Sequence, residues 1–248
     1  MGKSVNKQRL DLLLVERNLA TSRNQAQALI MEGVVYVNGQ KVDKSGTLLK
    51  IDSEILVKNS SLKYVSRGGL KLEGALKHFQ IDVKGCVALD IGASTGGFTD
   101  CLLQNGASKV YALDVGYGQL DWKLRNDDRV IVMEKVNARH MKEGDIPEKA
   151  DVVVMDASFI SLTKIITPSI IFLKSEGLLI ALIKPQFEVG KGEVGKGGIV
   201  RDENKHKEVV DKIIKHLESL NFNIKGVMPS PILGAQGNKE FIIVANKG

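Results

Sequence analysis

Cysteine and histidine are scarce in this sequence. Its 248 residues include 2 cysteines, Cys86 and Cys101, and 4 histidines. The cysteines form no C-x-x-C pair and the histidines share no metal-ligand spacing, so the sequence predicts neither a disulfide framework nor a metal site. This composition fits a reducing compartment, and we expect the protein in the cytoplasm.

Long uninterrupted hydrophobic runs are also missing. Charged side chains break every apolar run between Met1 and Asn18, so this segment lacks the core of a secretory signal. The most apolar region, residues 165–183, contains Lys174 and Glu176 near its centre. A membrane span needs about 18 uninterrupted apolar residues, so we expect no membrane insertion.

Positive charge is unevenly distributed along the chain. The sequence carries 35 Lys and Arg against 29 Asp and Glu, a formal net charge of +6. The segment that ends at Leu70 contains 11 of the basic side chains and only 6 of the acidic ones. Such a basic segment beside a nearly neutral body indicates a polyanion-binding module, with a solvated lysine-rich surface as the alternative.

The segment up to Val57 has the pattern of two short helices followed by a small sheet. Apolar residues at helical spacing begin at Leu10 and again after Ser22, a residue type that often caps a helix. Gly33 predicts the end of the second helix, and Asn38-Gly39 predicts a hairpin turn. Residues 51–57 predict another strand.

This pattern resembles the RNA-binding module of the ribosomal-protein S4 type, which also occurs in pseudouridine synthases and tyrosyl-tRNA synthetases. The stretches RLDLLL and SRNQAQALIMEGVVYVNGQKV carry the resemblance. In that family the second helix and the following turn present cations and amides to folded RNA. The resemblance therefore implies RNA contacts at Arg9, Arg23, Asn24 and Gln25.

A polar linker, residues 58–63, separates this α+β domain (residues 1–60) from a larger one (residues 61–248). Beyond it, seven apolar runs alternate with six stretches of helical pattern. This alternation is typical of a doubly wound, Rossmann-like α/β sheet. The predicted strands are Val87–Ile91, Lys109–Val115, Val130–Glu134, Asp151–Asp156, Gly177–Ile183, Ile224–Met228 and Phe241–Ala245.

The first of these strands ends in a glycine-rich turn, LDIGASTGGFT. A dinucleotide fingerprint would read GxGxxG, whereas this turn has the D-x-G-x-x-x-G-G form seen in S-adenosylmethionine-dependent methyltransferases. We therefore expect S-adenosylmethionine as the cofactor, with a merely structural turn or another nucleotide as the alternative. The candidate contacts in the turn are Asp90, Gly92, Ser94, Gly96, Gly97 and Phe98.

Two polar residues after the next strands extend this candidate site. Asp114 closes the second strand and follows Gly92 at the spacing typical of an acid that accepts hydrogen bonds from ribose hydroxyls. Asn137 follows the third strand and is a weaker candidate for contacting the adenine.

A second glycine-rich segment, residues 190–197, almost matches the phosphate loop GxxxxGK[ST]. Gly197 replaces the hydroxyl residue that would bind magnesium, so the sequence does not favour an NTPase. We expect a basic loop whose Lys191 and Lys196 touch substrate phosphates, or else a plain surface connection. Arg67 is a further candidate phosphate contact.

Four ionisable residues follow or precede predicted elements that meet at one end of the sheet: Lys71, Asp156, Lys184 and Glu240. The surrounding motifs SRGGLKL, LDIGASTGGF, DVVVMDASFISL, LIALIKPQFE and KEF occur in this order and resemble the hemolysin A (TlyA) family. Its catalytic domain is similar to FtsJ-type RNA 2′-O-methyltransferases, and their Lys-Asp-Lys-Glu tetrad falls on these four residues without a substitution. Two ordinary ion pairs at strand ends are the alternative.

Such a tetrad suits methyl transfer to a hydroxyl. A ribose hydroxyl is a poor nucleophile, while the methyl sulfonium is already activated, so catalysis needs in-line positioning and removal of a proton. Lys184 is the candidate base, since burial and a second cation, Lys71, favour a neutral amine. Asp156 would orient the amine and the hydroxyl, and Glu240 would hold Lys71.

The sequence thus predicts a two-domain methyltransferase that modifies a ribose 2′-oxygen of ribosomal RNA, in cytidine as the resemblance implies. The partners are ribosomal RNA or ribosomal subunits. One alternative is a non-catalytic RNA-binding protein, which the complete tetrad disfavours. Another is a membrane-active haemolysin, as the family name suggests, for which the sequence offers no apolar span.

Overall fold

The structure of the protein is a computed structural model that describes residues 7–20, 22–57, 63–190, 192–195 and 197–248. The chain divides into two compact units, residues 1–67 and 68–248. The division falls slightly beyond the predicted boundary at residue 60. The predicted linker, residues 58–63, lies outside the described residues except for Lys63.

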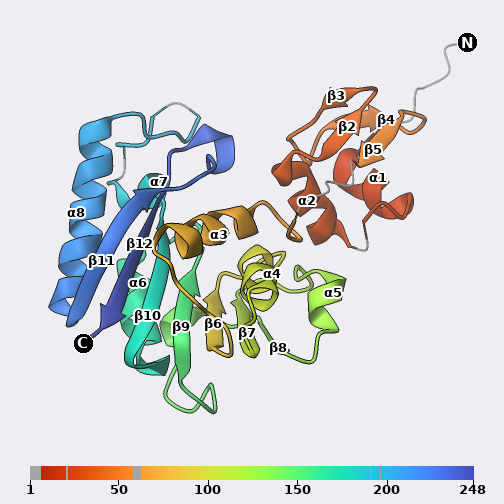
Figure 1. Ribbon diagram of the computed structural model, residues 1–248. Coiled ribbons are helices and arrows are strands. Elements are labelled where there is room, and N and C mark those ends of the chain that lie inside the picture. Colours follow the sequence, from red (N-terminus) through yellow and green to blue (C-terminus); the bar gives the residue numbers. More distant parts are fainter. Residues whose placement is uncertain (1–6, 21, 58–62, 191, 196) are drawn as a thin grey trace, which may run out of the picture. The chain divides into compact units, whose positions relative to one another are not determined.

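Among its described residues, the N-terminal unit contains two helices and five short strands. Helices α1 (Leu10–Glu16) and α2 (Arg23–Glu32) pack on each other (Figure 1). Their apolar faces and the strands enclose a small core that includes Leu10, Leu14 and Ile30. The strands are β1 (Lys7–Arg9), β2 (Val35–Val37), β3 (Gln40–Lys41), β4 (Leu48–Lys50) and β5 (Ile55–Val57).

The local signals of this unit form the expected structures. The Ser22 side chain accepts a hydrogen bond from the Gln25 amide at 3.1 Å and so caps α2. Gly33 ends that helix in the left-handed conformation, at φ 71°. Asn38 and Gly39, both at positive φ, turn β2 into β3.

The sheet of this unit differs from the prediction in two places. Only residues 55–57 of the predicted strand at 51–57 form a strand, β5, which pairs with β2. In addition, β1 and β4 form a separate antiparallel pair. Three-residue strands are too short for an alternating pattern to reveal them, because the partner strand is what defines them.

The C-terminal unit is built on a seven-stranded sheet in the order β11-β12-β10-β9-β6-β7-β8 (Figure 1). Each predicted strand is present, and the doubly wound α/β class is confirmed. The strands are β6 (Val87–Ile91), β7 (Lys109–Asp114), β8 (Val130–Glu134), β9 (Ala150–Met155), β10 (Leu173–Ile183), β11 (Phe222–Pro229) and β12 (Phe241–Lys247).

The prediction of a helix in all six connections is wrong for two of them. Only a 3₁₀ turn, η1 (Ala138–His140), separates β8 from β9, and η3 (Ala235–Gly237) lies between β11 and β12. The other elements are α3 (Gly68–His78), α4 (Gly97–Gln104), α5 (Trp122–Arg125), α6 (Thr163–Ser169), η2 (Ile170–Phe172), α7 (Pro185–Glu188) and α8 (Glu203–Ser219).

The described connection to β12 contains no α-helix, and β12 does not run parallel to the other strands. Strand β12 runs antiparallel to both of its neighbours, β10 and β11. The remaining pairs, β10-β9, β9-β6, β6-β7 and β7-β8, are parallel. The start of β12 therefore lies at the edge where the parallel strands end, with Phe241 opposite Ile183.

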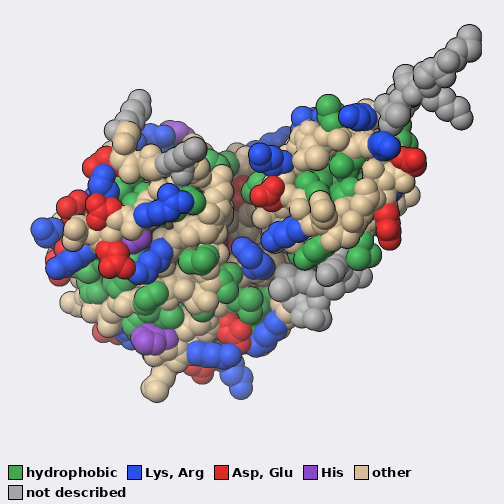
Figure 2. Space-filling model, turned by 90° about the horizontal axis from the view of Figure 1, so that it is seen from above, with side chains coloured by type: hydrophobic (Ala, Val, Ile, Leu, Met, Phe, Trp, Pro, Cys, Tyr) green, Lys and Arg blue, Asp and Glu red, His purple; other side chains and the backbone are tan. Residues whose placement is uncertain are grey.

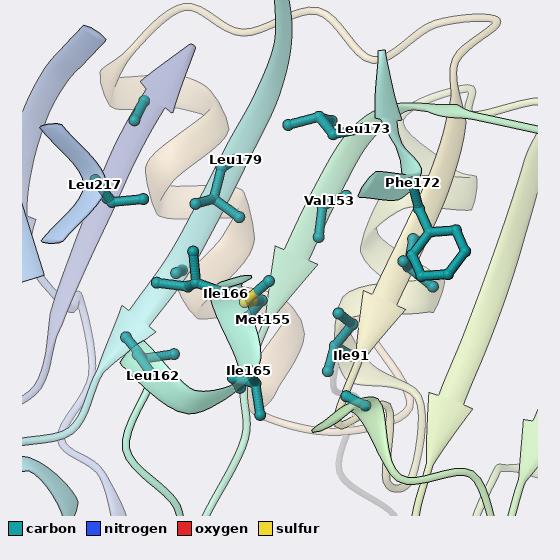
Figure 3. Close-up of a cluster of buried hydrophobic side chains, with 14 of the residues drawn as sticks. Ile91, Val153, Met155, Leu162, Ile165, Ile166, Phe172, Leu173, Leu179 and Leu217 are labelled. Atoms are coloured by element: carbon teal, nitrogen blue, oxygen red, sulfur yellow. The ribbon is translucent and has the colours of Figure 1, made fainter. Parts of the chain in front are cut away.

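Alternate residues of the strands face the two helical layers. Leu89, Ile91, Val153 and Met155 belong to one buried cluster with residues of α6 and α8, such as Ile165 and Leu217 (Figure 3). Because side chains alternate along a strand, Asp90 points to the opposite face. There it meets Thr99 of α4, which packs on α3. Within the described residues, no helix is long and apolar enough to cross a membrane.

Candidate active site and RNA contacts

The carboxyl ends of the parallel strands bring the predicted catalytic residues together. Asp156 directly follows β9, and Lys184 directly follows β10. Glu240 directly precedes the antiparallel strand β12, so it lies at the same edge. Lys71 comes from α3, which contacts β12. Open α/β sheets bind their ligands at this edge.

The four side chains form a chain of ion pairs. The Lys71 ammonium donates a hydrogen bond to Glu240 Oε2 at 2.7 Å, and Asp156 Oδ2 lies 4.0 Å from the same nitrogen. The Lys184 nitrogen is 2.6 Å from Asp156 Oδ1 and donates a hydrogen bond to Ser158 Oγ at 2.8 Å. Asp156 thus links the two lysines.

Burial makes this arrangement electrostatically strong. Lys71 and Lys184 are each 8% exposed, and Glu240 is 2% exposed. Burial disfavours the ionised Asp156, but the charges of Lys184 and Lys71 outweigh it and hold the pKa of this carboxyl below its usual value. Two cations and two anions therefore compensate each other beside the end of the sheet.

A glycine leaves room for the Glu240 carboxylate. A Cβ atom at Gly234 would lie 2.0 Å from Glu240 Oε1. Any side chain at this position would therefore displace the partner of Lys71. No signal in the sequence points to this contact, because Gly234 lies in a connection where glycine is common.

The glycine turn lies against the end of β9. Gly92 and Gly96 have φ angles of 84° and 98°, in the region that favours glycine. A Cβ atom at Gly92 would lie 2.9 Å from the Asp156 carbonyl oxygen. Gly97 begins α4, and Phe98 is buried. The turn and the tetrad are thus adjacent.

Asp114 faces the turn from the end of β7. Its Oδ2 accepts the Ser94 amide at 2.9 Å, and its Oδ1 accepts the Gly116 amide at 2.7 Å. Each carboxylate oxygen has two lone pairs, so each retains one for a further donor. Ribose hydroxyls are such donors. The geometry fits the predicted ribose contact.

Asp90 is buried beneath the turn. Its Oδ2 accepts a hydrogen bond from Thr99 Oγ1 at 2.7 Å, while its Oδ1 has no partner among the described residues. Burial raises the pKa of Asp90 to about 7, against the hydrogen bond from Thr99. Asp90 therefore supports the turn from below.

Asn137 is exposed, and its side chain caps η1 by accepting the Arg139 amide at 3.1 Å.

The second glycine-rich segment follows α7 and precedes α8 by several residues. It therefore lacks the strand-loop-helix context of a phosphate loop. Lys191 and Lys196 lie outside the described residues. No cluster of metal-binding side chains occurs among the residues that are described.

Two residues beside the tetrad were missed in the sequence. Phe159, three residues after Asp156, is 91% exposed and has a φ of 63°, and its ring centre lies 5.0 Å from that of Phe187. Glu188 is buried and accepts hydrogen bonds from the Leu162 amide at 2.6 Å and from Ser161 Oγ at 2.7 Å. It thereby anchors the segment that carries Phe159.

The predicted RNA contacts of the N-terminal unit include two arginines joined by an acid. Arg9 and Arg23 both bind Asp11, and their side chains remain 40% and 53% exposed. Arg67 is exposed, and the backbone amide of Gln25 donates to the Ser22 side chain that caps α2. The Asn24 side chain lies outside the described part. On the face in Figure 2, Lys and Arg side chains alternate with acidic and hydrophobic ones.

A seven-stranded sheet with an antiparallel β12, a glycine turn after β6 and an acid at the end of β7 defines a methyltransferase domain of the α/β class. The comparisons with known proteins agree. The chain belongs to the FtsJ-like methyltransferase family, whose model matches residues 64–247. The S4 domain model matches residues 8–55.

Relatives cover nearly the whole chain. The 16S/23S rRNA (cytidine-2′-O)-methyltransferase TlyA of Mycobacterium tuberculosis is 44% identical over 95% of this chain and 88% of its own length. Hemolysin A of Brachyspira hyodysenteriae is 46% identical over 94% of this chain and 98% of its own. A solved structure from Streptococcus thermophilus, 43% identical, covers 98% of this chain and 90% of its own with a TM-score of 0.76.

Proposed function

We propose that this protein transfers a methyl group from S-adenosylmethionine to a ribose 2′-oxygen of cytidine in ribosomal RNA. The observation that carries the proposal is the buried chain of ion pairs from Glu240 through Lys71 and Asp156 to Lys184, next to the glycine turn. The similarity to TlyA of M. tuberculosis supports the substrate class. Its place of action is the cytoplasm, where ribosomes are available.

The residues of the turn suit the cofactor. S-adenosylmethionine, when bound, supplies an activated methyl group on a sulfonium. Gly92 lets the turn pack against the backbone after β9, because a Cβ there would lie 2.9 Å from the Asp156 carbonyl oxygen. Asp114 would hold the ribose hydroxyls with the lone pairs that its two backbone partners leave. Ser94, Gly96, Gly97 and Phe98 shape the turn, and Asn137 would contact the adenine.

The tetrad positions the nucleophile and removes its proton. Lys184 accepts the proton of the 2′-hydroxyl through its neutral amine. Asp156 Oδ1 lies 2.6 Å from the Lys184 nitrogen, and Asp156 Oδ2 lies 4.0 Å from the Lys71 nitrogen. Glu240 fixes Lys71, and Asp156 orients the Lys184 amine toward the hydroxyl.

The exposed ring of Phe159 offers a stacking surface for a base. An unpaired base of folded RNA stacks on aromatic side chains, and this ring lies three residues from the catalytic acid. The ribose of such a nucleotide would then reach Asp156 and Lys184. The N-terminal unit supplies Arg9 and Arg23, together with Asn24 and Gln25, as further contacts to the RNA.

The reaction is tested with labelled S-adenosylmethionine and each ribosomal subunit from a strain that lacks this methylation. We expect incorporation of one label per site, resistance of the methylated ribose to alkaline cleavage, and no incorporation with Lys184→Ala. Label on a base rather than a ribose would contradict the proposal. Wild-type protein that binds subunits but never transfers the label would favour a non-catalytic RNA-binding protein.

The cofactor site is tested by calorimetry. Asp114→Asn should weaken S-adenosylmethionine binding about 10- to 100-fold, because hydrogen bonds to a charged group contribute about 1.5–3 kcal/mol. Asp128→Asn removes an exposed acid outside the glycine turn and the tetrad and serves as the control. Equal affinities of the two variants would refute the role of Asp114.

The similarity to Hemolysin A of B. hyodysenteriae raises membrane activity as a second function. Leakage of liposomes is measured beside methyl transfer with the same preparation. Methyl transfer without leakage is expected. Leakage that persists in Lys184→Ala would establish an activity independent of the tetrad.

A further inference from the structure

Asp11 is a buried acid of the N-terminal unit, covered by polar side chains, and it is not among the predicted RNA contacts. It lies in the first turn of α1 and is 0% exposed. A buried carboxylate is costly unless partners satisfy it. The side chains that bind Asp11 therefore indicate its role.

Three side chains from two elements, β1 and α2, donate to this carboxylate. Arg9, at the end of β1, donates from Nε to Oδ1 at 2.9 Å and from Nη2 to Oδ2 at 2.8 Å. Arg23, the first residue of α2, donates from Nε at 3.0 Å, and Gln27 from Nε2 at 3.0 Å. These bonds, led by those of Arg9, hold the pKa of Asp11 well below its usual range. The carboxylate stays charged at neutral pH.

The two arginines remain able to bind a second anion. A guanidinium has five N–H donors. Within the described residues, Arg9 uses two of them on Asp11 and Arg23 uses one. Both side chains are partly exposed. Asp11 therefore fixes one edge of each guanidinium and leaves other edges toward solvent.

We infer that Asp11 is a positioning residue that holds Arg9 and Arg23 as a preorganised pair for the phosphates of folded RNA. Long arginine side chains lose conformational freedom when they bind. Here that freedom is already lost when the unit folds, because both guanidinium groups bind the same buried carboxylate. The inference rests on the proposed RNA binding by this unit.

Charge alone predicts the opposite effect of Asp11. Replacing it with Asn removes one negative charge from a basic unit, so a purely electrostatic contribution would strengthen RNA binding. Loss of preorganisation would weaken it. The sign of the change therefore distinguishes the two explanations.

The test compares Asp11→Asn with Asp43→Asn in the full chain, using an unmethylated ribosomal subunit as the probe. Asp43 is an exposed acid of the same unit, so its replacement changes the charge equally without touching the arginine pair. We expect Asp11→Asn to weaken subunit binding about 10-fold, since ordering two side chains carries that cost, while Asp43→Asn binds as tightly as wild type or slightly more tightly. Unchanged or tighter binding by Asp11→Asn would overturn the inference.

A double-mutant cycle separates positioning from folding. In a chain that carries Arg9→Ala and Arg23→Ala, Asp11→Asn should cause no further loss of affinity. An equal 10-fold loss in this background would show that Asp11 acts through the fold, and would also overturn the inference. Circular dichroism and S-adenosylmethionine affinity check that each variant folds. If the two arginine substitutions leave subunit binding unchanged, the proposed RNA contacts themselves are wrong.

Discussion

Replacement of Lys184 by arginine tests the proposed base most directly. The Lys184 nitrogen lies 2.6 Å from Asp156 Oδ1 in a site that leaves it 8% exposed. An arginine keeps the positive charge and can keep the pair with Asp156. Its guanidinium does not deprotonate near neutral pH, so it cannot accept the proton of the hydroxyl.

Lys184 has two roles, as the base and as a cation paired with Asp156, and each predicts a loss of a different size. General base catalysis contributes about 10²- to 10⁴-fold, which equals about 3–5 kcal/mol of transition-state stabilisation. In Lys184→Arg the free energy of unfolding should fall by only about 1–3 kcal/mol, because the ion pair with Asp156 persists and only the larger side chain must be accommodated. In Lys184→Met, Asp156 keeps only Lys71, at 4.0 Å, so we expect the free energy of unfolding to fall by about 3–5 kcal/mol.

The assay is single-turnover methylation of an unmodified ribosomal subunit, with subunit and cofactor binding measured in parallel. Lys184→Arg should bind both but transfer the methyl group at least 100-fold more slowly, and the wild-type rate should rise with pH as the neutral amine becomes more abundant. Near-native transfer by Lys184→Arg, with an unchanged pH profile, would refute the base. The lysine would then serve as a cation only.

Four further predictions concern the surroundings of this site. Glu240→Gln removes the negative charge 2.7 Å from the buried Lys71 nitrogen, and it should lower the free energy of unfolding in urea by about 3–5 kcal/mol. Lys71→Met in the same chain should recover at least half of this loss, whereas strict additivity would contradict the pairing. Gly234→Ala places a Cβ 2.0 Å from the Glu240 carboxylate. It should slow methyl transfer about 10-fold or more while cofactor affinity stays unchanged. Methyl transfer at the wild-type rate would disprove this expectation. Asp90 has a folded-state pKa of about 7, above its ordinary 3.8, so its favourable contribution is complete below about pH 4 and is lost as the pH rises to about 7. The stability of Asp90→Asn relative to wild type should increase over that range, and a constant difference would argue against the raised pKa. Phe159→Ala should change the free energy of unfolding by no more than about 0.5 kcal/mol, because the ring is exposed. It should weaken subunit binding or methyl transfer about 10-fold, whereas Phe159→Trp should behave like wild type. Equal activity of wild type and both variants would exclude stacking.

Much of the architecture could be predicted because its signals are local. Ser22 and Gly33 delimit α2 through their own backbone and capping preferences, and Asn38-Gly39 specifies a hairpin whatever surrounds it. Central parallel strands such as β9 are largely apolar and buried, as a sheet covered on both faces requires. The glycine turn after β6 could also be predicted from local signals, since positive φ angles depend on the residues in the turn.

The position of Glu240 required the tertiary structure. Its proximity to Lys71 arises because β12 runs antiparallel between β10 and β11, and the sequence pattern suggested a helix before that strand. A strand's direction depends on which neighbours pair with it, and hydrophobic periodicity does not encode this. Residue types and order therefore indicated the tetrad, and strand pairing decided its distances.

Asp11, Phe159 and Glu188 show the same limit at the level of single side chains. In the sequence, Asp11 is one acid in an amphipathic helix and Glu188 one acid before a glycine-rich segment. Burial turns the first into an anchor for two arginines and the second into an anchor for the segment after Asp156. Phe159 is apolar and yet exposed. The sequence by itself determined the two domains, the strands and the candidate chemistry, while burial and long-range pairing, which depend on residues far apart in the chain, decided how these side chains meet.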